Sequence, residues 1–146
     1  MLNGLFKKLV VALLLSGPTL GMAFNVTVGD FGGAGNSTNG SFVAGVWTPT
    51  ADSNLDYADL QTALNAGTVS ITTNGAGTIE FGDESAEEPT FSLAASRTLN
   101  LLAEGDVIID YFVADSGAPG AASLNVEALG SVTIAPGSNS RQLSPK

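Results

Sequence analysis

Residues 98–109 of this chain, TLNLLAEGDVII, occur again 25 residues later as SLNVEALGSVTI, residues 123–134. Six of the twelve aligned positions are identical, and the alignment needs no gap. A looser copy at residues 68–81, TVSITTNGAGTIEF, has two more residues in its central turn. Each copy reads as two short strands around a glycine turn. A fixed period of this length predicts a coiled solenoid, in which each repeat stacks on the next.

The residues after Thr68 alternate between apolar and polar, which is the pattern of strands with one face in a core. Many of these strands start eight residues apart, too close for helical crossovers between them. Two all-β folds remain, a parallel β-helix and a β-sandwich. The repeat favours a parallel β-helix of about three coils over residues 68–134, because a β-helix stacks like residues on like once per coil. The β-sandwich remains the alternative.

If one period is one coil, inward side chains of the two best copies form a ladder with a spacing of about 4.8 Å. The predicted core ladder is Leu99, Val107 and Ile109 over Leu124, Val132 and Ile134. Asn100 is expected over Asn125, where the two amides form a ladder between coils. Gly105 and Gly130 mark the corners, and we expect a positive φ there.

Residues 1–23 have the pattern of a signal peptide. Lys7 and Lys8 form a basic region, an apolar run follows at residues 9–15, and Gly21-Met22-Ala23 supplies small residues at a cleavage site. A membrane anchor is disfavoured because Ser16-Gly17-Pro18 interrupts the run, which is also too short to span a hydrocarbon core of about 30 Å. We therefore expect cleavage after Ala23 and a protein that is secreted or held at a bacterial cell surface.

The rest of the chain divides by composition. Residues 24–55 are expected to contain N-terminal strands and a glycine-rich loop at 29–41, and residues 135–146 have the composition of a disordered tail. Residues 56–67 predict the one convincing helix, with Asp56 as its N-cap and a left-handed Gly67 after its last turn. This helix is expected either to cap the open end of the solenoid or to pack on its side.

The charge excludes several classes of partner. Loss of the two lysines in residues 1–23 takes the net charge from −9 to −11. Nucleic acid and an anionic membrane surface are therefore not expected partners, since both require a basic surface. The chain has no cysteine and no histidine, which removes disulfides, the usual zinc, copper and haem ligands, and the Ser-His and Cys-His nucleophile systems.

The densest acidic cluster is a candidate calcium site. It consists of Asp83, Glu84, Glu87 and Glu88. Paired carboxylates in a loop can hold calcium or act as acid and base, but these residues lack the spacing of a known calcium loop. Acidic runs are more often solvated surface, so we expect no cofactor, with calcium as the alternative.

An enzyme would need further groups. Asp106 and Asp110 flank a strand, and Arg97 is the basic residue nearest to them in sequence. These two aspartates and the arginine are the basis for an alternative function, that of a polysaccharide lyase or hydrolase. The aromatic candidates for stacking on sugars are Trp47, Tyr57, Tyr111 and Phe112, although such residues are more often part of a core.

Residues 46–73, VWTPTADSNLDYADLQTALNAGTVSITT, are followed by two strand pairs of the form L-x-L-x-A-x-G-x-[VI]-x-[IV]. The two forms together resemble the filamentous-haemagglutinin-like adhesins and exoproteins of bacteria. The resemblance covers about residues 46–134. It implies a right-handed parallel β-helix, exported to or beyond the outer membrane, that carries or forms an adhesive surface.

Two functions of different class follow. The first is a secreted or cell-surface structural or adhesive protein without turnover, which mediates attachment or the assembly of a matrix or filament. Its expected partners are host or cell-surface glycans or proteins and, through the open end of the solenoid, other copies of itself. The second is the secreted carbohydrate-active enzyme.

Overall fold

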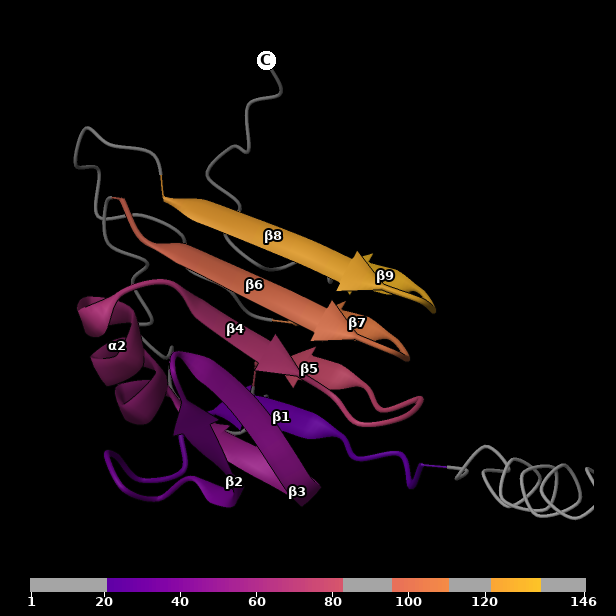
Figure 1. Cartoon of the computed structure of the whole chain (residues 1–146), viewed down its shortest axis with the longest axis horizontal. Coiled ribbons are helices and arrows are strands. Elements are labelled where there is room, and N and C mark those ends of the chain that lie inside the picture. The colour runs from indigo at the N-terminus through magenta and orange to yellow at the C-terminus, as the bar shows by residue number, and fades with distance from the viewer. Residues whose placement is uncertain (1–20, 83–95, 111–121, 135–146) are drawn as a thin grey trace, which may run out of the picture.

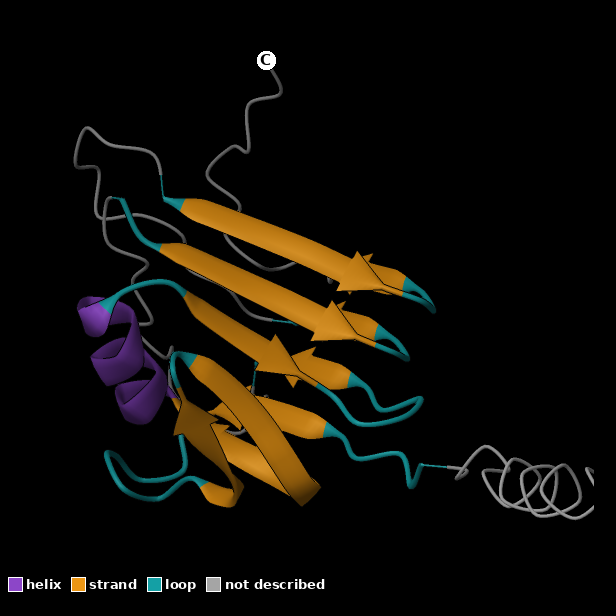
Figure 2. Ribbon diagram, in the orientation of Figure 1, coloured by secondary structure: helices purple, strands orange, loops and turns teal. Residues whose placement is uncertain are grey.

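The computed structural model describes residues 21–82, 96–110 and 122–134. They form a parallel β-solenoid of about three turns with one short helix, as Figures 1 and 2 show. The strands are β1 (Val26–Gly29), β2 (Thr38–Val43), β3 (Val46–Asp56), β4 (Val69–Thr72), β5 (Ile79–Phe81), β6 (Thr98–Ala103), β7 (Val107–Ile109), β8 (Ser123–Ala128) and β9 (Val132–Ile134). The helix is α2 (Tyr57–Ala66). The predicted parallel β-helix is thereby confirmed, and the β-sandwich is excluded.

One period of the repeat is one coil. β4, β6 and β8 pair in parallel on one face of the solenoid, and β5, β7 and β9 pair in parallel on the other. The register is the predicted one, with Leu99 beside Leu124, and Val107 beside Val132. Ile109 likewise lies beside Ile134. The repeated sequence therefore produces like-on-like stacking.

The core lies between the two faces. Along β6, buried and partly buried residues alternate strictly, and β4, β5 and β7 show the same alternation. The inward side chains of these four strands are Val69, Ile71, Ile79, Phe81, Leu99, Leu101, Ala103, Val107 and Ile109, and all are buried. Because successive side chains of a strand point to opposite faces, this alternation puts polar residues such as Ser70, Glu80 and Asn100 on the outside, together with the apolar Leu102 and Ile108.

The N-terminal strands belong to the same sheet as the coils. The first residues of β3, Val46 and Trp47, pair with β4, whereas residues 53–56 pair in parallel with β1. β1 pairs on its other side with β5. At this end of the solenoid, β3 therefore connects the two faces of the sheet, because its start pairs with β4 and its end pairs with β1. β2 adds an antiparallel hairpin strand to β3.

Helix α2 begins as predicted and ends differently. The Asp56 carboxylate accepts a hydrogen bond from the Ala58 N–H at 2.8 Å, which is the role of an N-cap. Gly67 follows the last turn but has an extended backbone, with φ 165°, so the predicted left-handed conformation is wrong. Figure 1 shows α2 beside the ends of β3 and β4, at the side of the stack. Tyr57, Leu60 and Leu64 on its inner face are buried in the core.

The predicted positive φ at the corner glycines is also wrong. The glycines with positive φ are Gly32, Gly33, Gly35, Gly45, Gly75 and Gly82, so neither Gly105 nor Gly130 is among them. Glycine is needed at these corners because adjacent coils approach closely. A Cβ atom on Gly105 would lie 2.5 Å from the Ala76 carbonyl oxygen, and one on Gly130 would collide with the Asp106 carboxylate.

Candidate functional site

The terminal coil is the candidate site, because it has the sequence of an internal coil but the surroundings of an end. The path of the sheet begins at β8 and ends at β9, so both ends of the path lie in this coil, drawn yellow in Figure 1. No described strand pairs with the outer edge of either. We call β8 and β9 together the open end. Its backbone N–H and C=O groups form a template for another strand.

Apolar side chains that would be buried in an internal coil are exposed at the open end. Val132 is 50% exposed and Ile134 is 57% exposed. Their partners one coil below, Val107 and Ile109, are 0% and 3% exposed. The side chains of β8 that face the core are only partly buried, and they are Leu124, Val126 and Ala128. In the predicted core ladder, the residues of the inner coil are therefore buried, whereas their partners in the last described coil are exposed or only partly buried.

The open end carries little charge. Glu127 is the one charged residue among residues 122–134. It is exposed and alternates with the inward-facing Val126 and Ala128, so it lies on the outer face. Leu129, in the turn after β8, is 84% exposed. The surface that the described residues leave uncovered is thus apolar and nearly neutral in a strongly acidic chain.

The outer face carries the predicted amide ladder. The Asn125 Nδ2 atom donates to Asn100 Oδ1 at 2.8 Å. The Asn100 Nδ2 atom donates in turn to the Ser70 hydroxyl at 3.0 Å. The ladder therefore links three consecutive coils, and its first member is a serine in the looser copy of the repeat.

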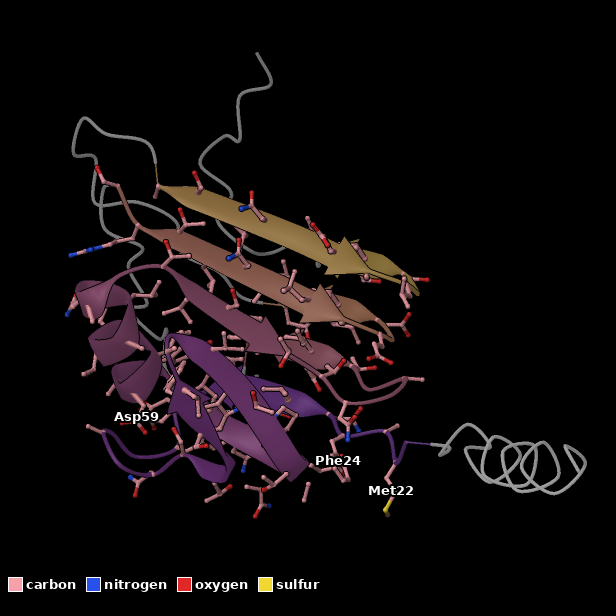
Figure 3. All side chains as sticks on the ribbon, in the orientation of Figure 1. Met22, Phe24 and Asp59 are labelled. Carbon is pink, nitrogen blue, oxygen red and sulfur yellow. The ribbon has the colours of Figure 1, made fainter. Side chains whose placement is uncertain are left out.

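A second cluster lies at the start of α2, where two carboxylates hold the glycine-rich loop. The Asp56 carboxylate accepts from the Phe31 and Gly33 N–H groups at 2.8 and 3.1 Å. The Asp59 carboxylate accepts from the Gly35 N–H at 2.8 Å and from the Ser37 hydroxyl. Figure 3 shows Asp59 beside this loop. The sequence identified Asp56 as the N-cap of the helix but did not connect it to the loop more than 20 residues earlier.

These hydrogen bonds change the acidity of Asp59. Burial raises the pKa of its carboxyl, but the hydrogen bonds from the Ser37 side chain and from the Gly35 and Ser37 backbone lower it. The hydrogen bonds prevail, and the pKa lies below the ordinary value of 3.8. They stabilise the ionised form, because a carboxylate accepts hydrogen bonds that a protonated carboxyl accepts less well. The cluster is satisfied internally and serves to fix the loop.

The acidic calcium candidates, Asp83, Glu84, Glu87 and Glu88, lie outside the described residues. Within residues 21–82, 96–110 and 122–134, no three acidic side chains are grouped as metal ligands would be. Calcium binding by the acidic loop therefore stays a hypothesis.

Two of the groups considered for an enzyme, Asp106 and Arg97, are engaged in structural contacts. The Asp106 carboxylate accepts from the Ser131 N–H at 2.7 Å, between coils. The Arg97 guanidinium donates to the Asn65 carbonyl oxygen at 2.8 Å, near the end of α2. Trp47 and Tyr57 are buried in the core, whereas Tyr111 and Phe112 lie outside the described residues. The structure does not bring Asp106 and Arg97 to a common partner.

Comparisons of the chain with protein-family models, curated proteins and solved structures find no match. The resemblance to the filamentous-haemagglutinin-like adhesins therefore remains a prediction from the residues that carry it. In the described part of the chain, no helix has the length and apolar character needed to cross a membrane.

Proposed function

We propose that this protein is a secreted or cell-surface structural protein without turnover, and that it acts by association through its open end. The observation that carries the proposal is the contrast between the two ends of one solenoid. β3 closes the N-terminal end, whereas the C-terminal coil exposes two strand edges and the apolar side chains of Val132 and Ile134. Such a surface favours binding to another protein.

The chemistry of the described residues fits a binding role better than a catalytic one. Several polar side chains join coils, as Asn125 and Asn100 do, and others hold the glycine-rich loop, as Asp59 and Ser37 do. The resemblance to bacterial adhesins points the same way, since those proteins use β-helices as rods and adhesive surfaces. Host or cell-surface glycans and proteins are the partners that this role implies.

The first experiment measures association. Purified mature protein is analysed by size-exclusion chromatography with light scattering over a wide range of concentrations. We expect the apparent mass to rise above that of the monomer as concentration increases. A monomer at every concentration, with no binding to cell surfaces or glycans, would contradict the proposal.

The second set of experiments tests the alternative function, a carbohydrate-active enzyme, and the predicted signal peptide. Acidic polysaccharides incubated with the protein in calcium buffer should remain uncleaved, because a structural protein has no turnover. Cleavage would establish the carbohydrate-active enzyme instead. The intact mass of exported protein should correspond to a chain that begins at Phe24, and export with Lys7 and Lys8 retained would refute the signal peptide.

A further inference from the structure

All regular free edges of the described sheet lie at one end of the solenoid. The path runs from β8 through β6, β4, β3, β1, β5 and β7 to β9. Because β3 joins the two faces, the path has no terminal strand at the N-terminal end. A head-to-tail stack requires an edge at each end of the molecule, and the N-terminal end offers only the outer edge of β2.

The edge of β2 is a poor template for pairing. Its register with β3 shifts between Thr38 and Gly40. Asn39, which lies at this shift, has a positive φ of 56°, and its side chain donates to the Asp52 carbonyl oxygen at 2.9 Å. Irregular edges of this kind protect natural sheets from adding strands.

We infer that the open end binds the open end of a second copy, head to head about a two-fold axis. The inference rests on the proposed function and specifies its partner and geometry. A two-fold axis perpendicular to the sheet faces lays β8 and β9 antiparallel to their own copies, so that the free N–H and C=O groups pair. It also brings Val132 and Ile134 against the same residues of the partner. The hydrophobic cores of the two copies then form one continuous core.

The distribution of charge permits a second copy at the open end. The full chain has a net charge of −9, so two copies repel each other over most of their surfaces. Residues 122–134 contain a single charge, on the outward-facing Glu127. Repulsion is therefore weak at the open end, and because residues 38–43 of β2 carry no charge either, the choice between the two ends rests on the sheet edges and not on charge.

Head-to-head pairing has a consequence for attachment. A contact between identical surfaces closes after two copies, whereas a head-to-tail contact continues into a filament. The closed pair is a solenoid of about twice the length, with the two β2–β3 hairpins at its opposite ends. Any binding site on the coils is then present twice, and two linked sites bind a surface more tightly than one.

The test compares two exposed valines at opposite ends of the solenoid. Val132 on β9 is 50% exposed, and Val43 on β2 is 66% exposed. In the full mature protein, Val132→Lys places a charge in the proposed contact and should halve the apparent mass by light scattering. Val43→Lys is the matched control and should leave the dimer intact. Circular dichroism establishes that both variants are folded.

A second measurement does not depend on destabilising the open end. The chain has no cysteine, so Thr133→Cys and Ser41→Cys each introduce a unique site for a spin label. Both residues are exposed. Labels at 133 should show strong dipolar coupling between copies, and labels at 41 should not.

The outcomes separate the inference from the proposed function. A mass that grows beyond the dimer, or coupling between labels at 41, would overturn the head-to-head pair while leaving assembly in place. Dissociation by Val43→Lys but not by Val132→Lys would place the contact at the other end and would also overturn it. A monomer at every concentration would remove both the pair and the self-association on which it rests.

Discussion

Leu99 and Leu124 are register partners in neighbouring coils, but Leu99 is fully buried and Leu124 only partly buried. Leu99 has Val69 on one side and Leu124 on the other. Leu124 has Leu99 on one side and no described strand on the other. The same residue type in the same repeat position therefore contributes differently to stability, because its coil lies at a different place in the stack.

This difference predicts the cost of truncating each leucine. Leu99→Ala should reduce the free energy of unfolding by about 2–5 kcal/mol, because it leaves a cavity between two coils. Leu124→Ala should cost less than about 2 kcal/mol, because its site is already open on one side. Urea denaturation of dilute, monomeric protein measures both. Equal losses would show that the terminal coil is covered.

The amide ladder predicts a coupling between two side chains. Asn125→Ala should cost about 1 kcal/mol or less, since an exposed hydrogen bond contributes little net stability. A double-mutant cycle with Asn100→Ala should give a coupling energy of about 0.5 kcal/mol or more. Strictly additive effects of the two substitutions would mean that the hydrogen bond between Asn125 and Asn100 does not contribute.

The lowered pKa of Asp59 predicts a loss of stability in acid. Its carboxyl releases its proton more readily in the folded chain than in the unfolded chain, where the ordinary value of 3.8 applies. The ionised group therefore stabilises the fold above that value, and this contribution disappears as the pH falls through the folded pKa. Asp59→Asn should be less stable than the wild type near pH 7, and the difference should shrink in acid.

Ser37→Ala provides the companion variant for Asp59. It removes the hydroxyl that donates to the Asp59 carboxylate, so the pKa of Asp59 should move back toward its ordinary value. Its acid dependence should resemble that of Asp59→Asn. Urea midpoints from about pH 7 to pH 2.5 measure the effect, and parallel curves for all three proteins would contradict it.

The corner glycines predict a contrast between two alanine substitutions. Gly105→Ala should destabilise the protein by about 1–3 kcal/mol, because the new methyl group collides with backbone oxygens of the coil below. Gly67→Ala meets no atom within 4 Å, and its backbone is extended. It should be neutral or slightly stabilising, since alanine restricts the unfolded chain. Thermal and urea denaturation rank the two variants.

The acidic residues 83–88 predict a null result with calcium. If Asp83, Glu84, Glu87 and Glu88 are solvated, millimolar calcium should leave the melting temperature nearly unchanged. Magnesium at the same concentration controls for ionic strength. A rise of several degrees with calcium alone would reveal a site, because a ligand that binds the folded state stabilises it by mass action.

The sequence alone determined the coil and its register. The 25-residue period aligned Leu99 with Leu124 and Asn100 with Asn125, and the structure has both pairs. This succeeded because stacking in a solenoid is a relation between equivalent positions of neighbouring repeats, which a repeat in the sequence records directly. The N-cap at Asp56 was predictable for a similar reason, since capping depends on residues only a few positions apart.

Only the tertiary structure decided how the N-terminal end of the solenoid is closed. β1 and β3 lie outside the repeat, and their pairing with β4 and β5 closes the N-terminal end. Non-local pairing of this kind depends on loop closure and on the packing of the whole core, which no local pattern encodes. The corner glycines show the same limit. Their role at Gly105 comes from the carbonyl oxygens of residues 76 and 77 in the coil below, and that proximity exists only once the coils have stacked.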